Sequence, residues 1–185
     1  MNKHTFRYFR DPYTHAVFGQ EPCEICGLNI HCLEGTYFQH NEIESLCLAC
    51  LRSGKGNLNV DLEEPEIKQN VIKMLQAAGK SADAVEGIIN EFKKTPPVPW
   101  VQHDEWVWCC GDFTTYVGGW KEEDFKHHLS TDTYKQELLQ LFDDYHRERI
   151  EIVDVFLEAI ENDWVVVFAF QCETCQKYHA VWQAY

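Results

Sequence analysis

Three Cys-x-x-Cys pairs constrain what this chain can fold into: Cys23 with Cys26, Cys47 with Cys50, and Cys172 with Cys175. Two thiolates separated by two residues are the usual half-site for a tetrahedral metal ion. Twenty residues separate the first pair from the second, a spacing typical of zinc ribbons. We therefore predict one closed, structural site made of the first four cysteines, filled by Zn²⁺ or less often by iron.

The third pair, Cys172 and Cys175, needs two further ligands to form a second site. The vicinal Cys109 and Cys110 are the best complement. Because adjacent residues of a strand point to opposite faces, both can ligate one metal only if the chain turns or bulges there.

An alternative for the second site stays open. One of the two vicinal cysteines could act together with a histidine, for which His179 and His103 are the candidates. The remaining cysteine, Cys32, is most simply a small buried residue.

The composition of the chain indicates which classes of partner and which cellular compartment to expect. The chain has 16 Lys and Arg against 30 Asp and Glu, a formal net charge of −14, and this argues against nucleic acid as a partner. A protein partner of basic character fits such a surface better. No apolar run is long enough to span a membrane and residues 1–12 lack an apolar signal segment, so we expect a cytoplasmic protein without membrane insertion. In that compartment thiols stay reduced, and nine cysteines cannot all pair as disulfides.

The pattern of apolar residues indicates an α+β fold. We expect a zinc-ribbon-like module over residues 1–58 and an α+β region with the second metal site over 59–185; the two can also pack as a single domain. Apolar residues recur at helical spacing after Pro65 and after Ser81, and throughout 132–161, which can be one long helix or two stacked ones. Short strands are expected at residues 105–110, 116–120 and 164–170, the last leading directly to Cys172.

Two functions of different classes fit these features. The first is an interaction or regulatory module with structural zinc, which uses an acidic helical face or exposed aromatic residues. The second is a zinc-dependent hydrolase-like enzyme, in which a water bound at the second site attacks substrate and Asp104, Glu105 or Asp112 acts as general base. The chain has no Gly-rich phosphate loop and no nucleophile elbow, and we name no catalytic residue.

A series of motifs resembles a known family. In chain order these are Phe6-Arg-Tyr8-Phe-Arg-Asp11-Pro12, the two knuckles ending in Leu46-Cys47-x-x-Cys50, Thr95-Pro96, Trp100-Val-Gln102-x-x-Glu105-Trp106, Cys110-Gly111-Asp112 and Phe170-Gln-Cys172-x-x-Cys175. Together they resemble the CbrC family of small bacterial proteins, which is associated with colicin tolerance and is otherwise largely uncharacterised. The resemblance implies His at position 109 and often Cys at 114, where this chain has Cys109 and Thr114. It implies no catalytic mechanism.

Overall fold

The computed structural model describes residues 4–38, 43–56 and 65–185. The chain divides into two compact units. Unit 1 comprises Met1–Pro99 and Cys109–Phe113, and unit 2 comprises Trp100–Trp108 and Thr114–Tyr185. The module boundary expected after residue 58 lies outside the described residues and stays a prediction.

Unit 1 begins with short elements that surround a two-stranded antiparallel sheet. Strand β1 pairs with β2 so that Cys32 lies opposite Cys47. Both strands are buried, and α2 follows β2 without a loop. The elements are α1 (Pro12–His15), β1 (Cys32–Glu34), the 3₁₀ helix η1 (Gly35–Tyr37), β2 (Ser45–Cys47) and α2 (Leu48–Arg52).

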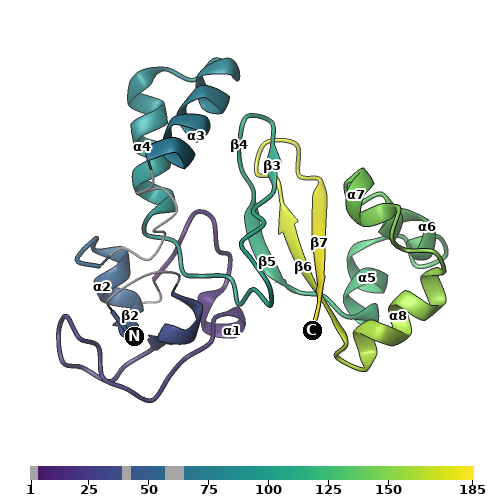
Figure 1. Cartoon of the computed structure of the whole chain (residues 1–185), viewed down its shortest axis with the longest axis horizontal. Helices are drawn as coiled ribbons and strands as arrows, with labels where there is room; N and C mark the ends of the chain where they lie inside the picture. Colours follow the sequence, from purple (N-terminus) through teal and green to yellow (C-terminus); the bar gives the residue numbers. More distant parts are fainter. Residues whose placement is uncertain (1–3, 39–42, 57–64) are drawn as a thin grey trace. The chain divides into compact units, whose positions relative to one another are not determined.

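A pair of helices, α3 (Pro65–Ala77) and α4 (Ala82–Phe92), completes the main part of unit 1 (Figure 1). The sequence predicts both. The Ser81 hydroxyl accepts a hydrogen bond from the backbone N–H of Ala84 and so caps α4, while Gly79 takes a φ of +80° between the helices. The apolar stripes of these helices face the core, where Leu75 is fully buried.

Unit 1 also contains a buried polar group next to an aromatic cluster. The Asp112 carboxylate accepts hydrogen bonds from the Tyr8 hydroxyl at 2.9 Å and from the Arg7 guanidinium at 2.6 Å. Burial and the Asp112 charge raise the pKa of Tyr8, so this hydroxyl stays protonated and donates. Next to it, the rings of Phe92 and Phe113 stack with their centroids 3.8 Å apart. These contacts hold residues 109–113 to the N-terminal segment and α4.

Unit 2 is built on the antiparallel sheet β5–β6–β7, whose strands span Thr115–Gly119, Val165–Gln171 and Tyr178–Ala184. Because side chains alternate along a strand, β6 sends Val167 and Ala169 to one face and Phe168 and Phe170 to the other. The first face packs against helices, which lie together on one side of the sheet (Figure 1). They are α5 (Glu122–His128), α6 (Tyr134–Leu139), α7 (Asp144–Arg147) and α8 (Val153–Glu161).

The second face of the sheet is covered by the segment that enters unit 2. The indole of Trp100 lies 4.7 Å from the Phe168 ring and that of Trp106 lies 5.5 Å from the Phe170 ring, measured between centroids. Gln183 holds this segment in place: its side-chain oxygen accepts from the N–H groups of Val101 and Gln102, and its amide donates to the carbonyl of His103. Both faces of the sheet are therefore buried.

The expectation of one long helix or two stacked helices over 132–161 is wrong, since three short helices occupy this range. After α6 the chain leaves the helical conformation, and the carbonyl of Leu141 accepts a hydrogen bond from the N–H of Ala180 in β7 instead of from a following helical turn. The Asp143 side chain then caps α7. No Gly or Pro marks these breaks, and the apolar spacing continues across them, so the N-cap residue Asp143 is the local signal for the start of α7.

The expected fold class is confirmed. The structure combines helices with short antiparallel sheets, and it has one four-cysteine group near the N-terminus and another in the C-terminal strands.

Candidate metal centres

The first four-cysteine group lies in unit 1. One ligand atom from each of Cys23, Cys26, Cys47 and Cys50 lies within 4.8 Å of the others. A tight turn places the first pair: the N–H of Gly27 donates to the carbonyl of Cys23 at 2.7 Å, and Gly27 has a φ of +71°. The end of β2 and the first turn of α2 place the second pair.

Burial and hydrogen bonds shift the pKa values of the thiols in this first group in different directions. Burial would raise the pKa of Cys23, but backbone N–H groups of Cys47, Cys26 and Ile25 outweigh it and lower that pKa to about 6. Burial raises the pKa of Cys47, and burial with the neighbouring thiols raises that of Cys50. Four thiolates so close together repel one another, whereas a bound dication would stabilise all four. The group is therefore suited to a metal ion.

The second group contains Cys109, Cys110, Cys172 and Cys175, again with their sulfur atoms within 4.8 Å of one another. Strands β3 (Trp108–Cys109) and β4 (Asp112–Phe113) form a hairpin that places the first pair. Cys110 and Gly111 in its turn have φ values of +52° and +73°. This is the turn that the vicinal pair requires, and it lets both sulfur atoms face the same point, 3.8 Å apart.

The Cys172–Cys175 pair lies in the turn between β6 and β7. The N–H of Cys172 donates to the carbonyl of Lys177, and the N–H of Gln176 donates back to the carbonyl of Cys172. The register of the sheet sets Thr115 opposite Gln171. Strand pairing within unit 2 therefore brings the residue before Cys172 beside the start of β5, a few residues after the Cys109–Cys110 turn.

In the structure the second group consists of cysteines, and their role as metal ligands stays a prediction. Among the described residues, the two groups above are the sets of three or more His, Cys, Asp or Glu placed to hold a metal ion, and neither includes His179 or His103. Cys32 also stands outside both groups; it is buried and its thiol donates to the carbonyl of Leu28.

Four sulfur ligands at these separations fit a tetrahedral, thiophilic ion such as Zn²⁺ or iron. When bound, such an ion would link the two halves of each group. The structure brings all eight predicted ligands into two sets, and their binding of metal stays a prediction. Each set already offers four ligands from the protein, which leaves no position for a catalytic water in tetrahedral geometry.

The carboxylates considered as general bases have other partners. Asp112 accepts hydrogen bonds from Arg7 and Tyr8 in unit 1. Glu105, in unit 2, lies with one oxygen 3.3 Å from Nε2 of His146 and the other 3.7 Å from Nε2 of His103.

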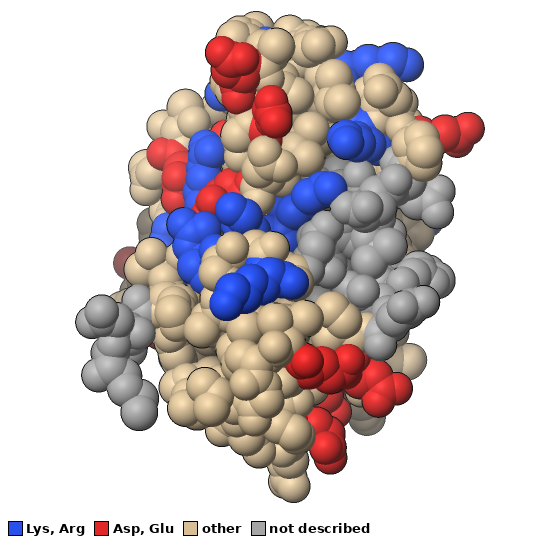
Figure 2. Space-filling model, turned by 90° about the vertical axis from the view of Figure 1, so that its left-hand side faces the viewer, with Lys and Arg blue, Asp and Glu red and all other residues tan. Residues whose placement is uncertain are grey.

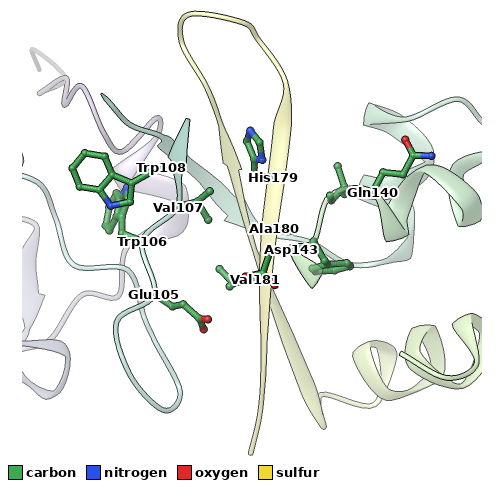
Figure 3. Close-up of a pocket in the computed structure, with 11 residues that line it drawn as sticks. Glu105, Trp106, Val107, Trp108, Gln140, Asp143, His179, Ala180 and Val181 are labelled. Atoms are coloured by element: carbon green, nitrogen blue, oxygen red, sulfur yellow. The ribbon is translucent and has the colours of Figure 1, made fainter. Parts of the chain in front are cut away.

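One feature of unit 2 is not evident from the sequence. A cavity of about 370 Å³ lies over β7, between residues 105–108 on one side and 140–143 on the other (Figure 3). Glu105, Asp143 and His179 line it. The sequence offers no motif for this cavity, because its walls come from three segments that only the fold brings together.

The negative charge is shared unequally between the units. Unit 1 has ten Lys and Arg against 14 Asp and Glu, a net charge of −4. Unit 2 has six Lys and Arg against 16 Asp and Glu and carries the remaining −10 of the −14.

Figure 2 shows Lys and Arg side chains gathered across the middle of one face. In unit 1, Arg52 forms an ion pair with Glu91, and Lys94 reaches Gly54 beside it.

The fold and the two groups define a small α+β protein with two four-cysteine sites that could each hold a metal ion. A model of the uncharacterised protein family UPF0167 matches residues 4–184, and the chain belongs to this family. No curated protein and no solved structure matches the chain. Within the described parts of the chain, no helix has the length and hydropathy that crossing a bilayer requires.

Proposed function

We propose that this protein is an interaction module in which two structural zinc ions hold the fold and unit 2 binds a basic segment of a protein partner. The observation that carries the structural role is the pair of complete four-thiol sets. A thiolate-only set suits zinc as a staple, because no ligand position remains for a substrate. The association with colicin tolerance that the CbrC resemblance implies belongs to this proposal as well.

An apolar groove beside α8 supports the interaction role. It has a volume of about 310 Å³ and is lined mainly by apolar side chains, with Ile152 and Val155 at 59% and 58% exposure. Large exposed apolar residues that lie together mark binding surfaces more often than isolated ones do. Trp182 lines the groove from β7. The groove therefore offers an apolar surface on which a few side chains of a partner can pack.

Charge favours a basic occupant for this groove. Helix α8 and its approach carry Glu151, Asp154, Glu158 and Glu161, within a unit of net charge −10. The one basic residue of the lining, Arg149, is engaged locally: its guanidinium lies 3.4 Å from the centre of the Tyr145 ring. An amphipathic segment with Leu on one face and Lys on the other complements this surface.

The hydrolase-like alternative lacks a supporting observation at the metal centres. It needs an open ligand position and a carboxylate aimed at it, whereas the second group offers four thiols and Asp112 is engaged with Arg7 and Tyr8.

The test combines metal counting with peptide binding. Native mass spectrometry of the purified chain should show two zinc ions per chain. A fluorescein-labelled amphipathic Leu/Lys helix should then bind the zinc-loaded protein in an anisotropy titration, and the same helix with Glu in place of Lys should not. Val155→Asp should weaken binding at least tenfold, because it puts a charge into the groove.

The matched control is Met74→Asp, an equally drastic change at a residue of α3 that is 49% exposed. It should leave the affinity unchanged. Equal weakening by both variants would refute the groove as the binding surface, and a folded chain free of zinc would refute the structural role of the metal.

A further inference from the structure

We propose that the cavity over β7 is a binding site for a small organic cation that carries primary ammonium groups. This site is separate from the cysteine groups and from the groove beside α8, and it goes beyond the interaction role. Its volume of about 370 Å³ lies within the range of small-molecule sites, which runs from roughly 300 to 1,000 Å³. All its lining residues belong to unit 2.

The charge of the lining points to a cation. Two carboxylates, Glu105 and Asp143, line the cavity, and no Lys or Arg is among the described residues that do so. Figure 3 shows that they come from opposite sides of β7. An anionic ligand would meet two carboxylates and no Lys or Arg in this lining, whereas an ammonium group is attracted by both carboxylates.

A buried histidine holds the two carboxylates in place. His146 is 3% exposed; its Nδ1 lies 2.8 Å from Oδ1 of Asp143, and its Nε2 lies 3.3 Å from Oε1 of Glu105. Its carbonyl accepts a hydrogen bond from the indole N–H of Trp182, which anchors this residue to β7. The imidazole ring thus lies between the two carboxylates, and two hydrogen bonds hold Asp143 in place before any ligand arrives, which favours binding.

Asp143 retains an oxygen for a ligand. Its Oδ1 accepts from both the backbone N–H and the ring of His146. Within the described residues, no hydrogen bond ends on its Oδ2. An ammonium group can therefore bind there without displacing the cap of α7.

A third polar group of the lining, His179, lacks a partner. Its Nε2 is buried and has no hydrogen-bond partner in the described parts of the chain. Burial, together with the charge of Lys177, lowers the pKa of His179, so the ring is neutral near pH 7 and adds no positive charge to the cavity. A neutral imidazole has one acceptor nitrogen, and an ammonium N–H is a suitable donor to it.

Two tryptophan residues belong to the lining of the cavity. Trp106 and Trp108 both line it, and the Trp106 indole is held by a hydrogen bond from its N–H to the carbonyl of Thr114. A bare metal ion is a poorer occupant, because the cavity's His and acidic side chains form no metal-holding group among the described residues.

The test uses three probes of the same four-carbon length on the zinc-loaded full chain: putrescine, 1,4-butanediol and succinate. Quenching or enhancement of tryptophan fluorescence reports binding, because Trp106 and Trp108 line the cavity. At physiological salt, putrescine should bind saturably with one molecule per chain, and the neutral and anionic probes should not bind. Binding of all three, or a putrescine signal that never saturates, would overturn the proposal.

Variants separate the cavity from general attraction to an acidic protein. Glu105→Gln should weaken putrescine binding at least tenfold, and Asp143→Asn, which keeps a capping side chain, should do the same. Glu158→Gln removes one charge from α8 outside the cavity and should leave the dissociation constant within twofold. If Glu158→Gln weakens binding as much as Glu105→Gln, the site is refuted. Peptide binding at the groove is measured separately, so failure of either proposal is recognisable.

Discussion

Replacing a predicted zinc ligand should destabilise the metal-binding part of unit 1 and leave the stability of unit 2 unchanged. The substitution is Cys47→Ser. In the structure Cys47 is 3% exposed and its sulfur lies 3.7 Å from that of Cys26. A serine hydroxyl does not ionise near neutral pH and is a poor ligand for a thiophilic ion, so the site falls from four thiolates to three.

Cys32→Ser provides a matched control. Cys32 lies directly opposite Cys47 in the β1–β2 pairing and is equally buried, but it belongs to neither cysteine group. The same sulfur-to-oxygen change therefore occurs at the same register of the same sheet. The serine hydroxyl can still donate to the carbonyl of Leu28, so we expect a loss of about 1 kcal/mol or less.

The magnitude follows from linkage between metal binding and folding. If losing one thiolate weakens zinc binding about 100-fold, the free energy of unfolding falls by about 3 kcal/mol, since each tenfold corresponds to about 1.4 kcal/mol. Subtracting about 1 kcal/mol for the control leaves a difference of about 2 kcal/mol. In hydrogen exchange this difference corresponds to about 30-fold faster exchange for amides that open by unfolding of the site.

The assay compares both variants with the parent chain. Hydrogen-exchange mass spectrometry should show the faster exchange in residues 32–34 and 45–52, and native mass spectrometry should show one zinc ion in Cys47→Ser but two in Cys32→Ser. All six tryptophans lie in unit 2, so the tryptophan fluorescence spectrum should be unchanged in both. If the two variants show the same exchange and the same zinc content, the reasoning that makes Cys47 a ligand and Cys32 a packing residue fails.

Two further substitutions test the packing that positions the second cysteine group and the cavity. Gly111→Ala should lower the free energy of unfolding by about 2 to 4 kcal/mol, because Gly111 has a φ of +73° and an added Cβ would lie 2.4 Å from the Cβ of Ala78. The control is Gly27→Ala, at a φ of +71° with no atom within 4 Å of the added Cβ, which should lower the free energy of unfolding by about 1 kcal/mol. Equal losses for the two variants in urea denaturation would disprove the Gly111–Ala78 contact. Gln183→Ala should lower the free energy of unfolding by about 2 to 4 kcal/mol, because the buried Gln183 side chain forms three hydrogen bonds to the backbone of residues 101–103. Urea unfolding followed by tryptophan fluorescence measures this loss, and a loss under about 0.5 kcal/mol would contradict the role of Gln183.

Local patterns account for the parts of the fold that the sequence predicts. Helices α3 and α4 begin and end near the residues that their apolar spacing, Pro65, Ser81 and Gly79 indicate. Strand β6 follows from a run of β-branched and aromatic residues at 165–170. These signals act over a few residues and do not depend on distant partners.

The division of residues 132–161 into three helices shows where such patterns fail. At the break after α6, a backbone carbonyl accepts a hydrogen bond from β7, some forty residues later in the chain. Within the segment, Asp143 is the local signal for a new helix, because Asp is a preferred N-cap residue, but the apolar spacing continues across the break. The cavity over β7 arises from the same break, since residues 140–143 form one of its walls.

The sequence by itself predicts the first cysteine group, because the spacing of Cys23, Cys26, Cys47 and Cys50 is that of two half-sites joined by a short connection, and the structure brings these four residues together. It left the second group open between cysteines and histidines. In the tertiary structure the second group consists of Cys109, Cys110, Cys172 and Cys175 and includes neither histidine, and its binding of a metal ion stays a prediction. Strand register depends on packing over the whole sheet, so contacts of this range cannot be derived from residue spacing alone.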